Sequence, residues 1–542
     1  MENERINQGI ARESDADFWA PGTLRLEDLQ RPSGGVLLQP VPTSDPNDPL
    51  NWSPWRKNVN FGLVCIYVLF TFVQLDIGFT AWAQYQDELG FGIDTLNGSA
   101  AANYAGLAVG CIFFLPLAHK YGRRPLYILS TVAQLAGAVW MARTENIADM
   151  YLSNVLSGLG GAISETIVQV TIADLFFVHQ HAAMNGWYLF ATFSGAYLGP
   201  VASGYVVSSQ GWRWMWWWCV ILFGINLVLV LLFFEESKYT VDAAILQYQT
   251  QHDSDVEPSA NAEDGKPAAE LVERTTSSAP LNMTIKMKPY SQRLAWITPT
   301  AGHLWRHFYQ PIVILFTFPA IAFTAITYGS LLAWFAILIS VQATYLFEPP
   351  YNFSPEGVGL MNLAPFIASM PGIAFGGYLS DRSILWLARR NNGIYEPEMR
   401  LWLALPSAIV VPAGILMFGL GLANESPWPV LAVGFGIFGC GFMVAADVAL
   451  SYAMDSYHDI IGDALVGVVF TRNVISVAVL FALDPWLLGM GIANVHIIAA
   501  VICFVLLLLP LLLLKWGKAA RRRSAEAYKK MALRQPTHRE FR

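Results

Sequence analysis

Four ionisable side chains interrupt stretches of the sequence that are otherwise apolar: Asp76, Glu165, Asp447 and Arg472, with Asn473 directly after the last of them. A charged group at the centre of a bilayer costs about 2.5–3.5 kcal/mol on insertion scales, so such groups persist only where they face a cavity or a partner. The chemistry open to them there is the binding of a proton or of a charged solute. We therefore expect these five residues to form a substrate or proton site inside the membrane.

Glu165 is the best candidate for proton binding. Burial disfavours the charged form of a carboxyl group, so a buried carboxyl without a permanent partner can take up a proton, whereas a nearby arginine favours the carboxylate. Glu165 and Arg472 lie at similar depths in two segments that cross the membrane in opposite directions. We hypothesise a switchable Glu165–Arg472 pair in which a proton or a substrate competes for the carboxylate. A permanent structural ion pair is the alternative.

The segment around Glu165 carries small and polar residues at helical spacing. They recur at intervals of four, three, four and four residues: Asn154, Gly158, Gly161, Glu165 and Gln169. This spacing places them on one face of a helix. Such a face suits either the wall of a cavity or a close contact between helices, and the sequence leaves both readings open.

The elements that must position these residues are membrane-crossing helices. Of the 542 residues, 54% are hydrophobic and 13% are charged, whereas about a quarter are charged in a typical soluble protein. A helix needs about 20 apolar residues to cross a bilayer. Twelve stretches qualify: 58–80, 95–117, 126–143, 149–175, 182–206, 213–235, 311–340, 356–379, 400–422, 428–453, 461–484 and 491–514. The predicted fold class is an all-α membrane protein.

The twelve stretches form two sets of six around a polar segment. The predicted parts are a cytosolic N-terminal segment, a six-helix half, a partly disordered cytosolic linker, a second six-helix half and a basic cytosolic tail, bounded as 1–57, 58–235, 236–310, 311–514 and 515–542. Each half has a basic turn between its second and third stretch. Such internal repeats are usual in secondary transporters, whose site lies near the membrane midplane between the halves. A scaffold or enzyme that shares only the helix count is the alternative.

The basic residues predict the orientation. All 33 Lys and Arg residues except Arg143, Arg213 and Arg472 fall on one side of this topology. By the positive-inside rule that side is cytosolic, so both termini and the linker are expected in the cytosol. The basic tail is expected to contact anionic lipid.

Other function classes find no support in the sequence. The net charge of −7 gives no sign of nucleic-acid binding, and the five cysteines all lie in apolar runs, which argues against a disulfide framework. No zinc-protease, phosphate-loop or nucleophile-elbow pattern occurs. We therefore predict no enzymatic activity, no metal and no cofactor. The sequons at Asn97, Asn352 and Asn424 are expected to face outward, and the sequence does not decide whether they carry glycans.

The basic turn of each half resembles the signature of the major facilitator superfamily, a glycine followed after three residues by an acid and then by basic residues. The first copy matches at its end and has His119 at the place of the acid and Leu115 at the place of the leading glycine; the second matches at its start. The matching residues are Gly122, Arg123, Arg124, Gly377, Asp381 and Arg382. The resemblance implies a cytosolic gate in which Asp174 pairs with Arg123 or Arg124. A plain positive-inside anchor is the alternative.

A narrower resemblance rests on "DPNDPLNWSPWRKN" before the first stretch, "ARRNNGIYEPEMRLW" after the eighth and "FTRN" in the eleventh. Together these are similar to the fungal branch of drug:proton antiporters and of histidinol and polyamine transporters. The fifth stretch is similar to the antiporter motif at Gly195, Gly199, Pro200 and Gly204, with Ser203 replacing one glycine. Tight helix packing explains these glycines equally well. Asn154 stands where drug antiporters often have arginine.

The resemblance implies the major facilitator fold, with Asp76, Glu165, Asp447 and Arg472 at or near a central cavity. It also implies a protein of the fungal plasma membrane that works as a monomer and binds a small molecule and protons. The predicted function is proton-coupled export of a drug-like compound or secondary metabolite by alternating access. Proton-coupled import of a polyamine-like cation is the alternative, and a solute sensor without transport is a further one. Substrate and direction stay open.

Overall fold

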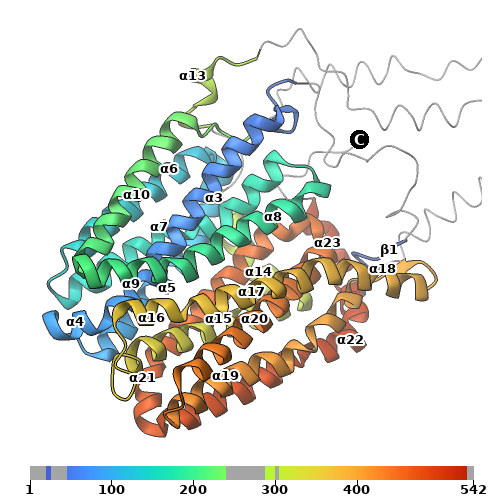
Figure 1. Cartoon of the computed structure of the whole chain (residues 1–542). Coiled ribbons are helices and arrows are strands. Elements are labelled where there is room, and N and C mark those ends of the chain that lie inside the picture. The colour runs from blue at the N-terminus through green and yellow to red at the C-terminus, as the bar shows by residue number, and fades with distance from the viewer. Residues whose placement is uncertain (1–19, 26–44, 240–286, 299–303, 534–542) are drawn as a thin grey trace, which may run out of the picture.

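The computed structural model describes residues 20–25, 45–239, 287–298 and 304–533. These residues form a bundle of helices that run side by side (Figure 1). The first half consists of η1 (Pro49–Asn51), α3 (Pro54–Asp76), η2 (Ile77–Ala81), α4 (Trp82–Leu89), α5 (Ile93–Tyr121), α6 (Arg124–Ala142), α7 (Ile147–Leu175), α8 (Val178–Phe193), η3 (Ser194–Leu198), α9 (Gly199–Gln210) and α10 (Trp212–Phe233).

The second half follows the short helix α13 (Tyr290–Arg293). It consists of α14 (Leu304–Thr317), α15 (Pro319–Tyr345), α16 (Pro355–Met361), α17 (Leu363–Ala374), η4 (Phe375–Leu379), α18 (Ser380–Arg390), η5 (Pro397–Ala404), α19 (Ser407–Ala423), α20 (Trp428–Ser456), η6 (His458–Ile460), α21 (Ile461–Leu507), α22 (Leu509–Arg523) and α23 (Ala525–Ala532). One small antiparallel sheet pairs β1 (Leu24–Arg25) with β2 (Ile394–Tyr395).

Ten helices in the described part of the chain are long and apolar enough to cross a membrane. Two further crossings complete the prediction. The helical stretch His458–Arg523 is interrupted at Gly491, whose φ of 76° lies in the left-handed region that glycine adopts without strain, so it contains two crossings. The predicted fifth crossing is divided among α8, η3 and α9. The predicted all-α membrane fold of twelve helices in two halves is therefore confirmed, whereas the residue bounds of the parts remain predictions.

Two crossings contain a π-helical turn. η3 precedes Pro200, and η4 follows Pro371. Proline removes a backbone donor, and a π-helical turn is one way in which a helix accommodates the resulting irregularity. Both crossings lie where the two halves meet, because η3 contacts α17, and α9 contacts α16. The fifth and eighth crossings therefore each contain an irregular turn close to this contact between the halves.

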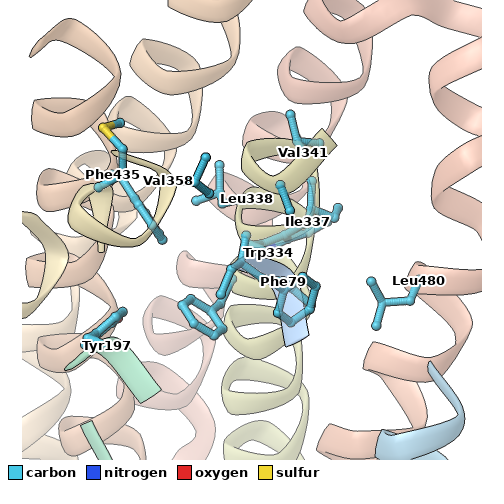
Figure 2. Close-up of a cluster of buried hydrophobic side chains, with 14 of the residues drawn as sticks. Phe79, Tyr197, Trp334, Ile337, Leu338, Val341, Val358, Phe435 and Leu480 are labelled. Atoms are coloured by element: carbon cyan, nitrogen blue, oxygen red, sulfur yellow. The ribbon is translucent and has the colours of Figure 1, made fainter. Parts of the chain in front are cut away.

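The main apolar core joins the two halves (Figure 2). Phe79 and Tyr197 come from the first half, and residues of α15, including Trp334 and Leu338, come from the second. Burial of these aromatic and branched side chains gives close packing and favourable dispersion contacts. The ring centroids of Tyr197 and Phe335 are 5.7 Å apart in an edge-to-face contact. The halves are thus firmly packed together in this part of the membrane.

The two ends of the bundle differ in charge. We call the end that carries Arg123, Arg400 and Arg521 the basic face, and the other end, which carries Glu88, the opposite face. Residues 20–25, the first segment that the structure describes, lie at the basic face, because the Pro21 carbonyl accepts a hydrogen bond from Arg521. The apolar core of Figure 2 lies toward the opposite face, because it contains Phe79, Trp82 and Tyr85 of η2 and α4, the elements that lead to Glu88.

Candidate functional site

The structure brings Glu165, Arg472 and Asn473 together between the halves. Glu165 is on α7, and the other two are on α21; their exposed fractions are 5%, 7% and 0%. The Arg472 guanidinium donates to Oε1 of Glu165, and Nδ2 of Asn473 donates to Oε2 at 3.1 Å. Both carboxylate oxygens are therefore engaged by groups of the other half.

The cluster is not completely satisfied. Nε of Arg472 and Oδ1 of Asn473 are buried without a hydrogen-bond partner among the described residues. The guanidinium also lies over the ring of Tyr328 on α15, 5.0 Å from its centroid, an arrangement in which the aromatic face attracts the cation. A buried ion pair is strongly held only when its remaining donors and acceptors are filled. This one keeps a free donor and a free acceptor for a ligand or for water.

The glycines on the same face as Glu165 are packing residues. A Cβ on Gly158 would lie 2.1 Å from the backbone oxygen of Asn103 on α5, and one on Gly161 would lie 3.3 Å from Leu107. Nδ2 of Asn103 donates to Oδ1 of Asn154 at 3.3 Å. On this side of α7, the glycines and Asn154 therefore pack closely against α5, and Glu165 belongs to the charged cluster.

The other two membrane carboxylates lie apart from this cluster. Asp76 is 4% exposed at the end of α3 and accepts no hydrogen bond from any residue that the structure describes. Tyr104 and Tyr197 are close enough to interact with it electrostatically. Asp447 lies against Gly376 in the π-helical turn η4. Asp76 is thus a buried carboxyl without a hydrogen-bond partner among the described residues. In this it differs from Glu165 and Asp447, which both have partners.

The basic turn of the first half is bound by its own half and by residues of the linker. Arg123 pairs with Asp174 at 2.8 Å. Arg124 donates to the backbone oxygens of Phe234, Leu231 and Leu294 at 2.8–2.9 Å. The expected contact between Asp174 and an arginine is present, and its role in gating remains a prediction.

Glu236 is a residue of this turn that the sequence analysis missed. Its carboxylate accepts hydrogen bonds from the backbone N–H groups of Arg123 and Arg124 at 2.9 and 3.1 Å, and it lies against Gly122, whose φ is 109°. Burial and the charge of Arg123 lower the pKa of the neighbouring Lys238 to about 8. The only signal in the sequence was the acidic pair Glu235 and Glu236 at the end of the sixth apolar stretch.

Glu236→Ala is expected to lower the free energy of unfolding by about 1–2 kcal/mol, because the first N–H groups of α6 lose a charged cap. Unfolding of the purified protein in detergent measures the change. Glu145→Ala, at an exposed position, is the control and is expected to have little effect. Equal stability of the two variants would contradict a capping role for Glu236.

The corresponding turn of the second half is described only in part. Gly377 lies in η4 and Asp381 in α18, and their surroundings lie outside what the structure describes. Arg382 is exposed on α18. The predicted gating roles of these three residues remain predictions.

The antiporter-like motif of the fifth crossing contacts both halves. A Cβ on Gly195 would lie 2.5 Å from the backbone oxygen of Leu69, and Gly199 is close to Val73, both on α3. Further along, a Cβ on Gly204 would lie 2.5 Å from the oxygen of Pro355, and the oxygen of Pro200 faces Gly359. The glycines therefore permit close backbone approach, first within the first half and then across to the second.

Two further expectations concern metals and glycans. No group of three His, Cys, Asp or Glu residues that could hold a metal occurs among the described residues. Asn97 is 2% exposed inside α5, and its side chain accepts a hydrogen bond from Ser340. Its sequon is thus inaccessible, whereas Asn352 and Asn424 are exposed.

The chain is similar to known proteins over most of its length. The model of the Major Facilitator Superfamily matches residues 59–476. An MFS-type transporter of Schizosaccharomyces pombe is 32% identical over 91% of this chain and 90% of its own length, and Protein HOL1 of Saccharomyces cerevisiae is 30% identical over 92% of each. The efflux pump radE of Floropilus chiversii is 26% identical over 88% of this chain and 83% of its own length.

Solved structures share the fold. The xylose transporter XylE of E. coli, in a partially occluded inward-open conformation, aligns with a TM-score of 0.56 over 85% of this chain and 98% of its own, at 12% identity. The narrower branch suggested by the sequence is not settled by these similarities. The match of the family model over most of the chain, together with relatives at 30% identity or more, shows that the chain belongs to the Major Facilitator Superfamily and is a multi-pass membrane transporter.

Proposed function

We propose that this chain is a proton-coupled exporter of a small organic molecule that works by alternating access. The observation that carries the proposal is the buried Glu165–Arg472 pair, with Asn473, which joins the two halves inside the membrane. A contact that holds two moving halves together must break and re-form during each cycle. A pair that a proton can break gives the cycle its energy source.

In the proposed cycle, the deprotonated Glu165 binds Arg472 and Asn473. A proton that enters from outside neutralises the carboxylate and breaks the pair with Arg472. Substrate that binds from the cytosolic side competes with this proton for Glu165, so substrate binding releases the proton. Loss of the proton on the other side restores the pair. Because the pair is buried, forming or breaking it changes the relative stability of two arrangements of the halves. An ion pair at an exposed surface would have a much smaller effect.

Direction and location are further parts of the proposal. The concentration of Lys and Arg on the basic face supports a cytosolic position for that face and for both termini. The name of the relative radE, an efflux pump, supports export. The antiporter-like packing of Gly195, Gly199, Pro200 and Gly204 is consistent with proton exchange against the substrate. We place the protein in the plasma membrane and expect it to work as a monomer.

A second candidate is import of an organic cation, and Asp76 favours it. A buried carboxyl without a hydrogen-bond partner is unfavourable as an anion unless a cation joins it. Asp447 adds a further carboxylate in the membrane. The arrangement suits an ammonium group better than an organic anion.

Asp76→Asn is expected to abolish binding of an organic cation while leaving the free energy of unfolding nearly unchanged, since this carboxyl has no hydrogen bond to a described residue that the substitution could break. Binding and thermal unfolding of the purified protein measure the two effects. Asp94→Asn, at an exposed position in the first turn of α5, serves as control. Undiminished binding of a cationic substrate by the Asp76 variant would exclude this residue from the site.

Metabolite profiling of cytosol and medium, in the native host with the gene deleted and overexpressed, tests the direction and finds the substrate. An exporter predicts a compound that accumulates inside on deletion and outside on overexpression. A compound that remains in the medium on deletion and enters on overexpression would show import. Counterflow in proteoliposomes then separates a transporter from a sensor, because only a transporter exchanges labelled substrate across the membrane.

A further inference from the structure

Residues 20–25 lie on the basic face of the second half, although the chain next enters the first half. β1 pairs with β2 in the loop after the eighth crossing, with Leu24 opposite Tyr395 and Arg25 opposite Ile394. Gly22 has a φ of 81° and lies against the backbone oxygen of Asp455 at the end of α20. A two-residue strand alone has little stability, so other contacts must hold the segment in place.

Arg521 supplies those contacts. Its side chain is 1% exposed, and Nε donates to Oε1 of Glu398 at 2.9 Å. The same guanidinium donates to the carbonyl oxygen of Pro21 and, at 3.3 Å, to the hydroxyl of Thr23. A buried ion pair needs its remaining donors satisfied. Residues 21 and 23 meet this requirement for the Arg521–Glu398 pair.

The binding surface is built from three parts of the second half. Arg400 pairs with Asp455 at 2.5 Å, and the Tyr395 hydroxyl donates to the same carboxylate. These contacts fix the loop after the eighth crossing to the end of α20, where Gly22 is seated. The surface therefore selects an extended segment that offers two acceptors to Arg521 and has a glycine in the left-handed conformation between them.

The chain is anchored a second time where it enters the first half, by the start of the linker and by α3. The Tyr239 hydroxyl donates to Asp45 at 3.0 Å, and Nζ of Lys57 donates to the Leu50 carbonyl at 2.9 Å. Residues 26–44 join the two anchors and could span roughly 65 Å if extended, more than the thickness of a membrane. A segment of this length is too long to restrain the distance between the two halves by itself. A connection between the halves through the N-terminal segment therefore depends on the docking of residues 20–25.

We propose that the basic face of the second half is a docking surface for the chain's own residues 20–25, and that this docking makes the N-terminal segment a second, releasable connection between the halves. The linker 236–310 is the first. This docking is an interaction within the chain and is independent of the direction of transport, the substrate and proton coupling.

The test introduces a protease site within 26–44 of the full-length protein. After cleavage of the purified protein in detergent, the N-terminal fragment is expected to remain bound during gel filtration. Gly22→Ala is expected to release it at least about tenfold faster, because the new Cβ would lie 2.2 Å from the Asp455 oxygen and φ is unfavourable for alanine. Thr23→Val, which removes only the hydroxyl acceptor, is expected to have an intermediate effect.

Gly90→Ala is the matched control. Gly90 also has a positive φ, 70°, and has no atom near the position of its Cβ, so the variant carries the same backbone strain without the clash. The fragment should stay bound in this variant. Equal release from the wild type and from Gly22→Ala would overturn the proposal. Chemical cross-linking of the uncleaved protein tests whether the segment docks within one chain. A cross-link between residues 20–25 of one copy and the second half of another copy would overturn docking within one chain.

Discussion

Glu165→Gln is expected to abolish proton-driven accumulation of substrate in proteoliposomes and to make the remaining exchange independent of pH. Glutamine keeps the shape of the side chain and cannot be ionised, so the pair with Arg472 is permanently lost. Removing one partner of a buried pair costs about 3–5 kcal/mol, because the other charge is left uncompensated. The free energy of unfolding should therefore fall as well.

The double variant Glu165→Gln, Arg472→Gln separates stability from coupling. It contains no uncompensated charge, so its stability should lie closer to the wild type than that of either single variant, while its transport should remain independent of pH. Glu88→Gln is the control, because Glu88 pairs with Arg213 at an exposed position, where an ion pair is worth about 0–1 kcal/mol. Unchanged rate and pH dependence in Glu165→Gln would exclude the pair from coupling.

Gly204→Val is expected to reduce transport to background without preventing folding. The atoms nearest to a Cβ at this position are the oxygen of Pro355, at 2.5 Å, and Cα of Glu356, at 3.0 Å. Both belong to the other half, so the larger side chain would prevent α9 and α16 from meeting near the opposite face. Backbone atoms cannot move aside as a flexible side chain can, so the contact must open.

Labelling with a membrane-impermeant thiol reagent measures this opening. Ser340→Cys, introduced after replacement of the native cysteines, should react faster from the opposite face when combined with Gly204→Val. Gly224→Val is the control, because Gly224 on α10 has no atom near the position of its Cβ, and it should transport normally. Normal transport by Gly204→Val would show that this contact need not close.

The charged cluster could be predicted because of the cost of burying charge. Arg472 had to find a partner inside the membrane, and Glu165 was the acid at the same depth in a helix of the other half. The structure brings these two residues together with Asn473. The contribution of Tyr328 was not predicted, because an aromatic residue in a membrane helix is far more often an interfacial anchor.

The surroundings of Asp76 and Asp447 could not be predicted, because they depend on irregular turns of the helices: Asp447, inside α20, lies against the π-helical turn η4. The first crossing was expected to run to residue 80, but α3 ends at Asp76 and a 3₁₀ turn follows. Asp76 consequently lies at the end of the helix, apart from the Glu165 cluster. The seventh crossing was likewise expected to be continuous, but it is divided at Phe318, before Pro319.

Contacts to the backbone were the least predictable. Arg124 binds three carbonyl oxygens, and a carbonyl acceptor is present at every position of a sequence. Residues 20–25 have no hydrophobic period that would predict a docked strand, and their partner Arg521 appeared only as part of a basic tail. In both cases a buried arginine is satisfied by backbone geometry that becomes visible only in three dimensions.

Glu165 is proposed to exchange a proton when the substrate binds. A pH-sensitive dye in weakly buffered solution detects this exchange. Saturating amounts of the substrate found by profiling are added to the purified protein in detergent. The wild type should release a proton as substrate binds, Glu165→Gln should bind without release, and Glu88→Gln should behave as the wild type. Equal release from the wild type and from Glu165→Gln, or none from the wild type, would contradict proton coupling through this pair.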